Sequence, residues 1–160
     1  MTELSSRQIA EYFRRSYTAA DGLWFMKVEE KYGFDVALGV DDEVWKVLPK
    51  IQARMIKQFL GLEEGPEALF EGLIARLDLE GFKFKAEKTT KGFQISVTDC
   101  PWYNLMIKSG REQLAEQVGK KVCTTEYQVW VSELAANMKF TLRSQKCDNS
   151  ECCILDFVNQ

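Results

Sequence analysis

Apolar residues recur at helical spacing through the first half of the chain. Such spacing places one apolar face along each helix, and it continues to residue 81. The expected helices cover residues 6–17, 21–32, 35–38, 42–60 and 66–80. Ser5 or Ser6 offers the first N-cap, Asp41 or Asp42 offers another, and Pro49 should kink or split the helix that contains it. Residues 1–81 are therefore expected to be mainly helical.

The apolar period changes from 3.6 to 2 at Phe82. Apolar and polar residues alternate over 82–87 and again over 93–98, with a turn at 89–92 between them. This alternation predicts a β-hairpin with one buried face and one solvated face. A second alternating pair, over 140–143 and 152–157, closes the chain.

Helical signals return between the two hairpins. Asp99 is a suitable N-cap for one helix, residues 111–120 form another piece, and Thr125 with Gln128 has the spacing of a capping box. Two hairpins joined into one sheet with helices on the apolar face form an α+β fold. We therefore expect a single domain over residues 1–160, in which 82–160 build a four-stranded antiparallel sheet packed on helices.

Composition excludes several classes of function. The 160 residues carry a net charge of -3, so a broad cationic field for nucleic acid is not expected. The chain has no histidine, which excludes a Ser-His-Asp or Cys-His catalytic unit and a histidine metal site. No apolar run approaches the length of a membrane span, and the first ten residues have no apolar core typical of a secretory signal. We therefore expect a cytoplasmic protein with no nucleic-acid or membrane partner.

Two cysteines lie where a helix start would activate a thiol. Cys100 follows the expected cap Asp99, and Cys123 follows two lysines and precedes the expected cap at Thr125. Helix N-termini and basic side chains favour the thiolate, although the Asp99 carboxylate opposes this effect at Cys100. The simpler interpretation is that both cysteines fill space in the core.

Other residues suggest metal or ligand binding. A thiolate metal or redox site would use Cys100, Cys123, Cys147 and Cys152, although no C-x2-C pair is present. Aromatic residues beside carboxylates suggest a small-molecule pocket, because such pockets combine apolar walls with a few polar groups. The candidate ligand-binding residues are Asp21, Trp24, Glu29, Trp102 and Tyr103. The same aromatic residues would equally serve as core.

Several segments resemble a known group. The stretch DGLWFMKVEEKYGFD at 21–35, DEVW at 42–45 and IQAR at 51–54 resemble an uncharacterised family of small bacterial and archaeal proteins. That family is related to the L-2-amino-thiazoline-4-carboxylic acid hydrolase group, whose spaced cysteines resemble DCPW at 99–102, Cys123 and Cys153. The resemblance implies hydrolysis of a cyclic amidine or C–N bond, with Cys100 or Cys123 as nucleophile and Asp99, Glu29 or Glu126 handling protons.

The order of helices and hairpins also resembles vinyl-reductase-type ligand-binding domains and TRAPP transport subunits. That resemblance implies a small or greasy ligand and a possible homodimer, at the level of fold analogy. The sequence therefore favours a small-molecule-binding domain, with a cysteine hydrolase as the first alternative and a cysteine-ligated metal or redox protein as the second. It identifies no cofactor.

Overall fold

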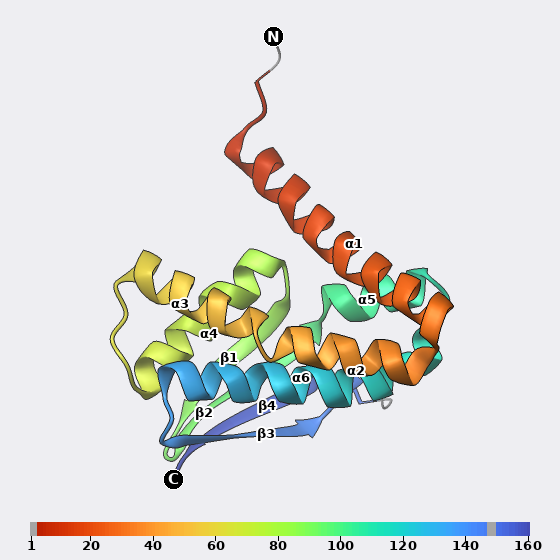
Figure 1. Cartoon of the computed structure of the whole chain (residues 1–160). Coiled ribbons are helices and arrows are strands. Elements are labelled where there is room, and N and C mark those ends of the chain that lie inside the picture. The colour runs from red at the N-terminus through yellow and green to blue at the C-terminus, as the bar shows by residue number, and fades with distance from the viewer. Residues whose placement is uncertain (1–2, 147–149) are drawn as a thin grey trace. The chain divides into compact units, whose positions relative to one another are not determined.

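The computed structural model describes residues 3–146 and 150–160, and it has α+β architecture (Figure 1). Its elements are α1 (Ser6–Tyr32), α2 (Phe34–Trp45), α3 (Leu48–Leu60), α4 (Pro66–Glu80), β1 (Lys83–Thr89), β2 (Gly92–Asp99), α5 (Pro101–Lys108), α6 (Glu112–Leu134), β3 (Met138–Ser144) and β4 (Cys153–Asn159). Contacts between residues divide the chain into two units, Met1–Val40 and Asp41–Gln160. The expectation of one domain over the whole chain stays a prediction.

The first unit consists of α1 and the beginning of α2. Ser5 caps α1 as expected. Its hydroxyl accepts a hydrogen bond from the Gln8 backbone N–H, and the Gln8 side-chain oxygen accepts one from the Ser5 backbone N–H. The two expected helices over 6–17 and 21–32 are one continuous helix, since Asp21 interrupts neither the backbone nor the apolar spacing. Gly33 ends it with a φ of 88° and an extended ψ of 165°, a conformation that favours glycine.

The second unit contains the expected four-stranded antiparallel sheet. Its strand order is β1-β2-β4-β3, so the two hairpins meet where β2 pairs with β4. Phe93 lies opposite Phe157 in that pairing, and Phe140 lies opposite Phe157 across β3 and β4. These rings form the centre of the core, and Phe93 stacks on Phe157 with ring centroids 4.6 Å apart. The predicted architecture of hairpin, helices and hairpin is confirmed.

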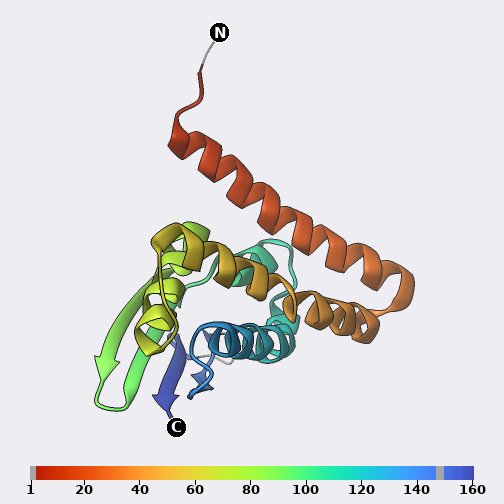
Figure 2. The same ribbon diagram turned by 60° about the vertical axis from the view of Figure 1, so that its left-hand side comes forward.

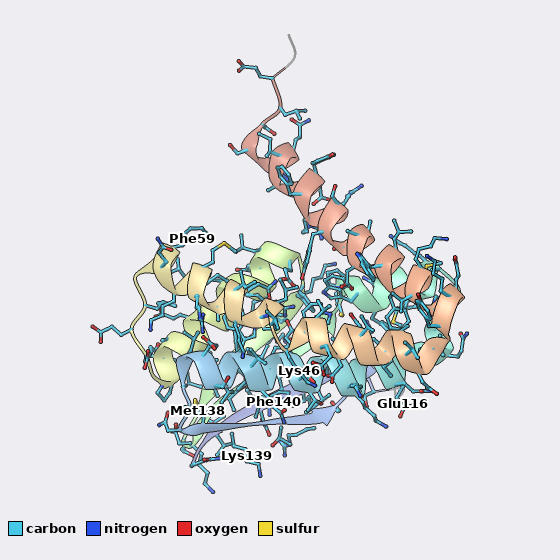
Figure 3. All side chains as sticks on the ribbon, viewed as in Figure 1. Lys46, Phe59, Glu116, Met138, Lys139 and Phe140 are labelled. Carbon is cyan, nitrogen blue, oxygen red and sulfur yellow. The ribbon has the colours of Figure 1, made fainter. Side chains whose placement is uncertain are left out.

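One face of the sheet carries the helices of the second unit. Figures 1 and 2 show α4 and α6 across this face, and α3 contacts both helices and forms an outer layer. Met138 and Phe140 are buried on the helix side of β3, whereas Lys139 points to solvent (Figure 3). The alternation read from the sequence therefore assigns the two faces correctly.

Helix boundaries differ from the expectation around Pro49 and along α6. The chain divides into α2 and α3 near Val47, with Pro49 in the first turn of α3, where its missing N–H has no helical partner to lose. Asp41 and Asp42 consequently lie in the last turn of α2 and cap no helix. Residues 112–134 form one helix, because Thr125 continues the helical backbone and uses its hydroxyl elsewhere.

Candidate functional site

Three thiols gather inside the second unit. Cys100 lies between β2 and α5, Cys123 lies within α6, and Cys153 begins β4. All three side chains are partly buried and pack against the hydrophobic core. The thiols are close enough for the charge of one to raise the pKa of another, as Cys153 does for Cys100 and Cys123. The structure therefore brings together the two cysteines that the sequence singled out.

A buried ion pair accompanies these thiols. Arg76 of α4 is 2% exposed, and its Nη2 lies 2.5 Å from Glu126 Oε1 of α6 and 2.7 Å from Glu80 Oε2. Its Nη1 donates to the Tyr127 hydroxyl at 3.4 Å, and its guanidinium carbon lies 5.0 Å from the centre of the Phe82 ring. We call Arg76, Glu126, Tyr127, Cys100 and Cys123 the internal polar cluster.

Both thiols of the internal polar cluster keep their protons at neutral pH. Burial raises the pKa of Cys100 to about 12, although the backbone N–H groups of Tyr103 and Trp102 work against the rise. Burial also raises the pKa of Cys123 well above its usual value, and the Glu126 charge adds to the effect. The expectation that a helix start would lower the Cys123 pKa is wrong, because Cys123 lies in the middle of α6.

Asp99 also differs from its expected position. It is the last residue of β2, and Cys100 takes the N-cap position of α5 with no side-chain cap. The Asp99 carboxylate instead accepts a hydrogen bond of 2.6 Å from Asn104 Nδ2 and lies 3.7 Å from Lys83 Nζ. Asp99 therefore holds the start of α5 against the sheet edge, and its role as a proton carrier stays a prediction.

A second polar group lies at the C-terminal end of α2. Asp41 and Asp42 occupy its last turn, where a negative charge opposes the helix dipole. Asp42 is 8% exposed and well satisfied: its Oδ1 accepts a 2.5 Å hydrogen bond from the Thr125 hydroxyl. Its Oδ2 lies 3.2 Å from Lys46 Nζ (Figure 3) and 4.0 Å from Lys121 Nζ. These partners hold the pKa of Asp42 below its usual value despite its burial.

Asp41 is in the opposite electrostatic state. Burial raises the pKa of its carboxyl to about 6, hydrogen bonding from the Trp45 side chain opposes the rise, and the neighbouring charge of Asp42 adds to it. The two adjacent carboxylates thus differ, because lysines and a hydroxyl compensate only one of them. Such separation of pKa values between neighbouring acids is typical of functional sites.

The Trp45 indole lies beside Asp41, and a second indole, that of Trp102, packs against Trp45. Trp45 is 3% exposed and meets the half-buried Trp102 of α5 edge to face, with ring centroids 5.6 Å apart and planes at 88°. Tyr103, next along α5, donates to Glu112 Oε1 at 3.4 Å. We call Asp41, Asp42, Trp45, Trp102 and Thr125 the α2-end site, to which α2, α5 and α6 all contribute.

The remaining predicted ligand-binding residues belong to the first unit. Asp21, Trp24 and Glu29 lie on α1, where Trp24 is 67% exposed and the two acids are half-buried. Trp102 and Tyr103 lie on α5 in the second unit. The ligand-binding role of all five residues stays a prediction.

The cysteine metal site gains no geometric support within residues 3–146 and 150–160. No three His, Cys, Asp or Glu side chains in those ranges are arranged to hold a metal ion. Cys100, Cys123, Cys152 and Cys153 are in no disulfide, and Cys147 lies outside the described residues. Among the same residues, no helix is both long enough and apolar enough to cross a membrane.

Sequence reasoning missed the roles of Asp41, Asp42 and Arg76. Either Asp41 or Asp42 was expected as an N-cap, because an aspartate just before a helical apolar pattern is a common capping residue. Three successive acidic residues, Asp41, Asp42 and Glu43, close to the end of a helix are a weak signal here, because they could mark either the end of one helix or the start of the next. For Arg76, the signal is a charge between Leu73 and Leu77 on an otherwise apolar helical face.

Comparison with known proteins shows which family the chain belongs to, but it indicates no activity. No curated protein and no solved structure matches the chain. Nothing in the comparisons links it to the L-2-amino-thiazoline-4-carboxylic acid hydrolase group, so that relationship stays a prediction. One family matches residues 3–157, which is nearly the whole sequence. The chain belongs to DUF6125, a family of unknown function.

Proposed function

We propose that this protein binds a small organic cation at the α2-end site. The observation that carries the proposal is the contrast between Asp42, which is fully partnered, and Asp41, which is half-buried beside the Trp45–Trp102 pair. A cationic ligand would supply the charge that Asp41 lacks. Indole rings attract cations through their negative faces, which adds to the carboxylate interaction.

The ligand class follows from the two kinds of group at the site. A planar amidinium or aminoheterocycle can pair with a carboxylate and stack on an indole. Asp41 must be ionised to bind such a cation, and its pKa is about 6. Affinity should therefore be full above pH 7 and fall as the pH drops through 6.

Thermal denaturation with a matched ligand pair tests this proposal. Benzamidine and 2-amino-2-thiazoline are the cationic probes, and benzamide is the neutral isostere of benzamidine. A probe at 100 times its Kd adds about 2.7 kcal/mol, which corresponds to a rise in Tm of roughly 5–10 °C for a chain of this size. Stabilisation by the cations at pH 7.5 that weakens at pH 5 supports the proposal.

The matched variants are Asp41→Asn and Asp78→Asn. Both remove one carboxylate, but Asp78 is exposed on α4 and lies outside the site. Asp41→Asn should abolish the response to benzamidine, whereas Asp78→Asn should retain it. An equal response to benzamide, or no response to any cation, contradicts the proposal.

A cysteine hydrolase is less well supported by the same geometry. A cysteine nucleophile acts as its thiolate, and burial keeps Cys100 and Cys123 protonated. As part of the proposal we place the protein in the cytoplasm, where reducing conditions suit the free state of its described thiols.

A further inference from the structure

Helix α3 carries two apolar faces. The buried face comprises Pro49, Ala53 and Ile56. A second row consists of Val47, Ile51, Met55 and Phe59, which are spaced four residues apart. At 100° per residue, each step of four turns only 40° around the helix, so these side chains form one continuous strip. We call this row the outer α3 stripe.

The outer α3 stripe is exposed along its whole length. Its side chains are 56%, 56%, 44% and 71% exposed in chain order. Phe59, the most exposed of them, lies on the side of α3 away from the sheet (Figure 3). Helix α3 packs on α4 and α6, and its buried residues are those of the other face. An apolar row at regular spacing is unlike the scattered exposed residues that need no explanation.

The area of the stripe fits association of two copies. With ordinary side-chain areas, the exposed fractions correspond to roughly 500 Å² of surface per copy, at the upper end of the largest patch on a typical monomer. Two such stripes facing each other remove about 1,000 Å² from water, the lower limit for a specific interface. The stripe alone therefore suits a weak dimer, and residues next to the stripe would add to the buried area.

The charges beside the stripe also favour a second copy. One edge of α3 carries Lys50, Arg54 and Lys57, and the helix has no acidic residue. Arg54 pairs with Glu133 at 2.8 Å, and Lys57 pairs with Glu64 at 3.0 Å. Because these carboxylates neutralise most of the basic edge, two copies can approach without strong like-charge repulsion. The same pairing leaves little cationic charge for an anionic membrane surface.

We propose that the outer α3 stripe is the contact surface of a reversible homodimer. A two-fold axis across α3 places each stripe against its counterpart, so the interface is self-complementary. This proposal is independent of the α2-end site, because none of the stripe residues belongs to that site.

Sedimentation velocity of the full chain over a concentration series tests the dimer. Dithiothreitol is present throughout so that no intermolecular disulfide forms. The expected result is a shift from the 18.4 kDa chain mass toward twice that mass as the concentration rises from about 5 to 500 μM. Ile51→Arg should remain monomeric over the whole series, because it places a charge in the centre of the stripe.

Ile107→Arg is the matched control. Ile107 is also an exposed isoleucine on a helix of the second unit, at 44%, but it lies on α5. This variant should associate like the unchanged protein, and circular dichroism should show both variants folded. A wild-type chain that stays monomeric at 500 μM overturns the proposal, including the case in which it instead cosediments with vesicles of phosphatidylserine. Unchanged association of the Ile51→Arg variant also overturns it.

Discussion

Replacing Asp41 by asparagine should stabilise the protein at neutral pH. The pKa of Asp41 is raised from 3.8 to about 6 in the folded chain, so the folded state binds its proton more tightly than the unfolded state does. The free energy of unfolding contributed by this group therefore falls as the pH rises from about 4 to 6, and it stays low above that range. Asparagine carries no charge and can still accept the Trp45 hydrogen bond.

The size of this effect follows from the pKa difference. One pKa unit corresponds to 1.36 kcal/mol, so the full difference would be near 3 kcal/mol, and partial exposure to water reduces it to about 1–2 kcal/mol. Urea denaturation at pH 4, 5, 6 and 7 measures it. The gain of Asp41→Asn over the unchanged chain should be absent at pH 4 and complete at pH 7.

The control for this prediction is again Asp78→Asn, which removes the same charge from an exposed position. It should give no comparable gain at any pH. If Asp41→Asn is destabilising at pH 7, or if its gain persists unchanged at pH 4, burial does not raise the pKa of the Asp41 carboxyl as we describe. A stabilised variant that has lost its response to benzamidine would show that the wild-type residue is kept for binding.

Three further predictions concern the interior. Arg76→Met should cost about 3–5 kcal/mol in urea denaturation, because it removes the cation that faces the buried Glu126 carboxylate and the Glu80 carboxylate, and adding Glu126→Leu should recover part of this loss. A cost below about 1 kcal/mol contradicts the role of the pair. Gly92→Ala should cost more than 2 kcal/mol, because a Cβ there would lie 2.1 Å from the Phe157 carbonyl oxygen, whereas Gly39→Ala on α2 meets open space and should be neutral or stabilising. The two thiols of the internal polar cluster should react with iodoacetamide at pH 8 much more slowly in the native chain than after urea unfolds it, because their raised pKa values keep them protonated. Equal labelling rates in the two states, read by mass spectrometry, would contradict this.

The sheet could be predicted from the sequence because its signal is local. Alternation over 82–87, 93–98, 140–143 and 152–157 indicates which side chains face inward, and the turn at Thr90 and Lys91 fixes the first hairpin. Both ends of α4 are likewise marked locally, by Gly65 and Pro66 at the start and Gly81 at the end. Proline suits the first helical position, and glycine adopts the left-handed conformation that ends the helix. Features of this kind depend on a few neighbouring residues.

Helix continuity and the sites depend on partners distant in sequence. Thr125 has the local spacing of a cap, but its hydroxyl donates a hydrogen bond to Asp42, which is 83 residues away, and so α6 continues through Thr125. The neighbouring lysines and the expected helix start predicted a lowered pKa for Cys123, but burial in the core raises that pKa. The joining of the two hairpins into one sheet and the proximity of Cys100 and Cys123 are the distant relationships that the sequence suggested correctly.

The internal polar cluster and the α2-end site differ in whether their charged groups have partners of opposite sign. In the internal polar cluster, Arg76 provides the positive charge for Glu126, and the adjacent thiols remain neutral, so each charge already has a partner of opposite sign. At the end of α2 the lysines compensate Asp42, and Asp41 remains as a carboxylate whose ionisation the fold disfavours. Asparagine at position 41 would avoid this cost, and the cation that we propose as ligand would offset it by pairing with the carboxylate. A fold that needs its buried charges for stability pairs them, and one that uses a charge for binding leaves it to be paired by the ligand.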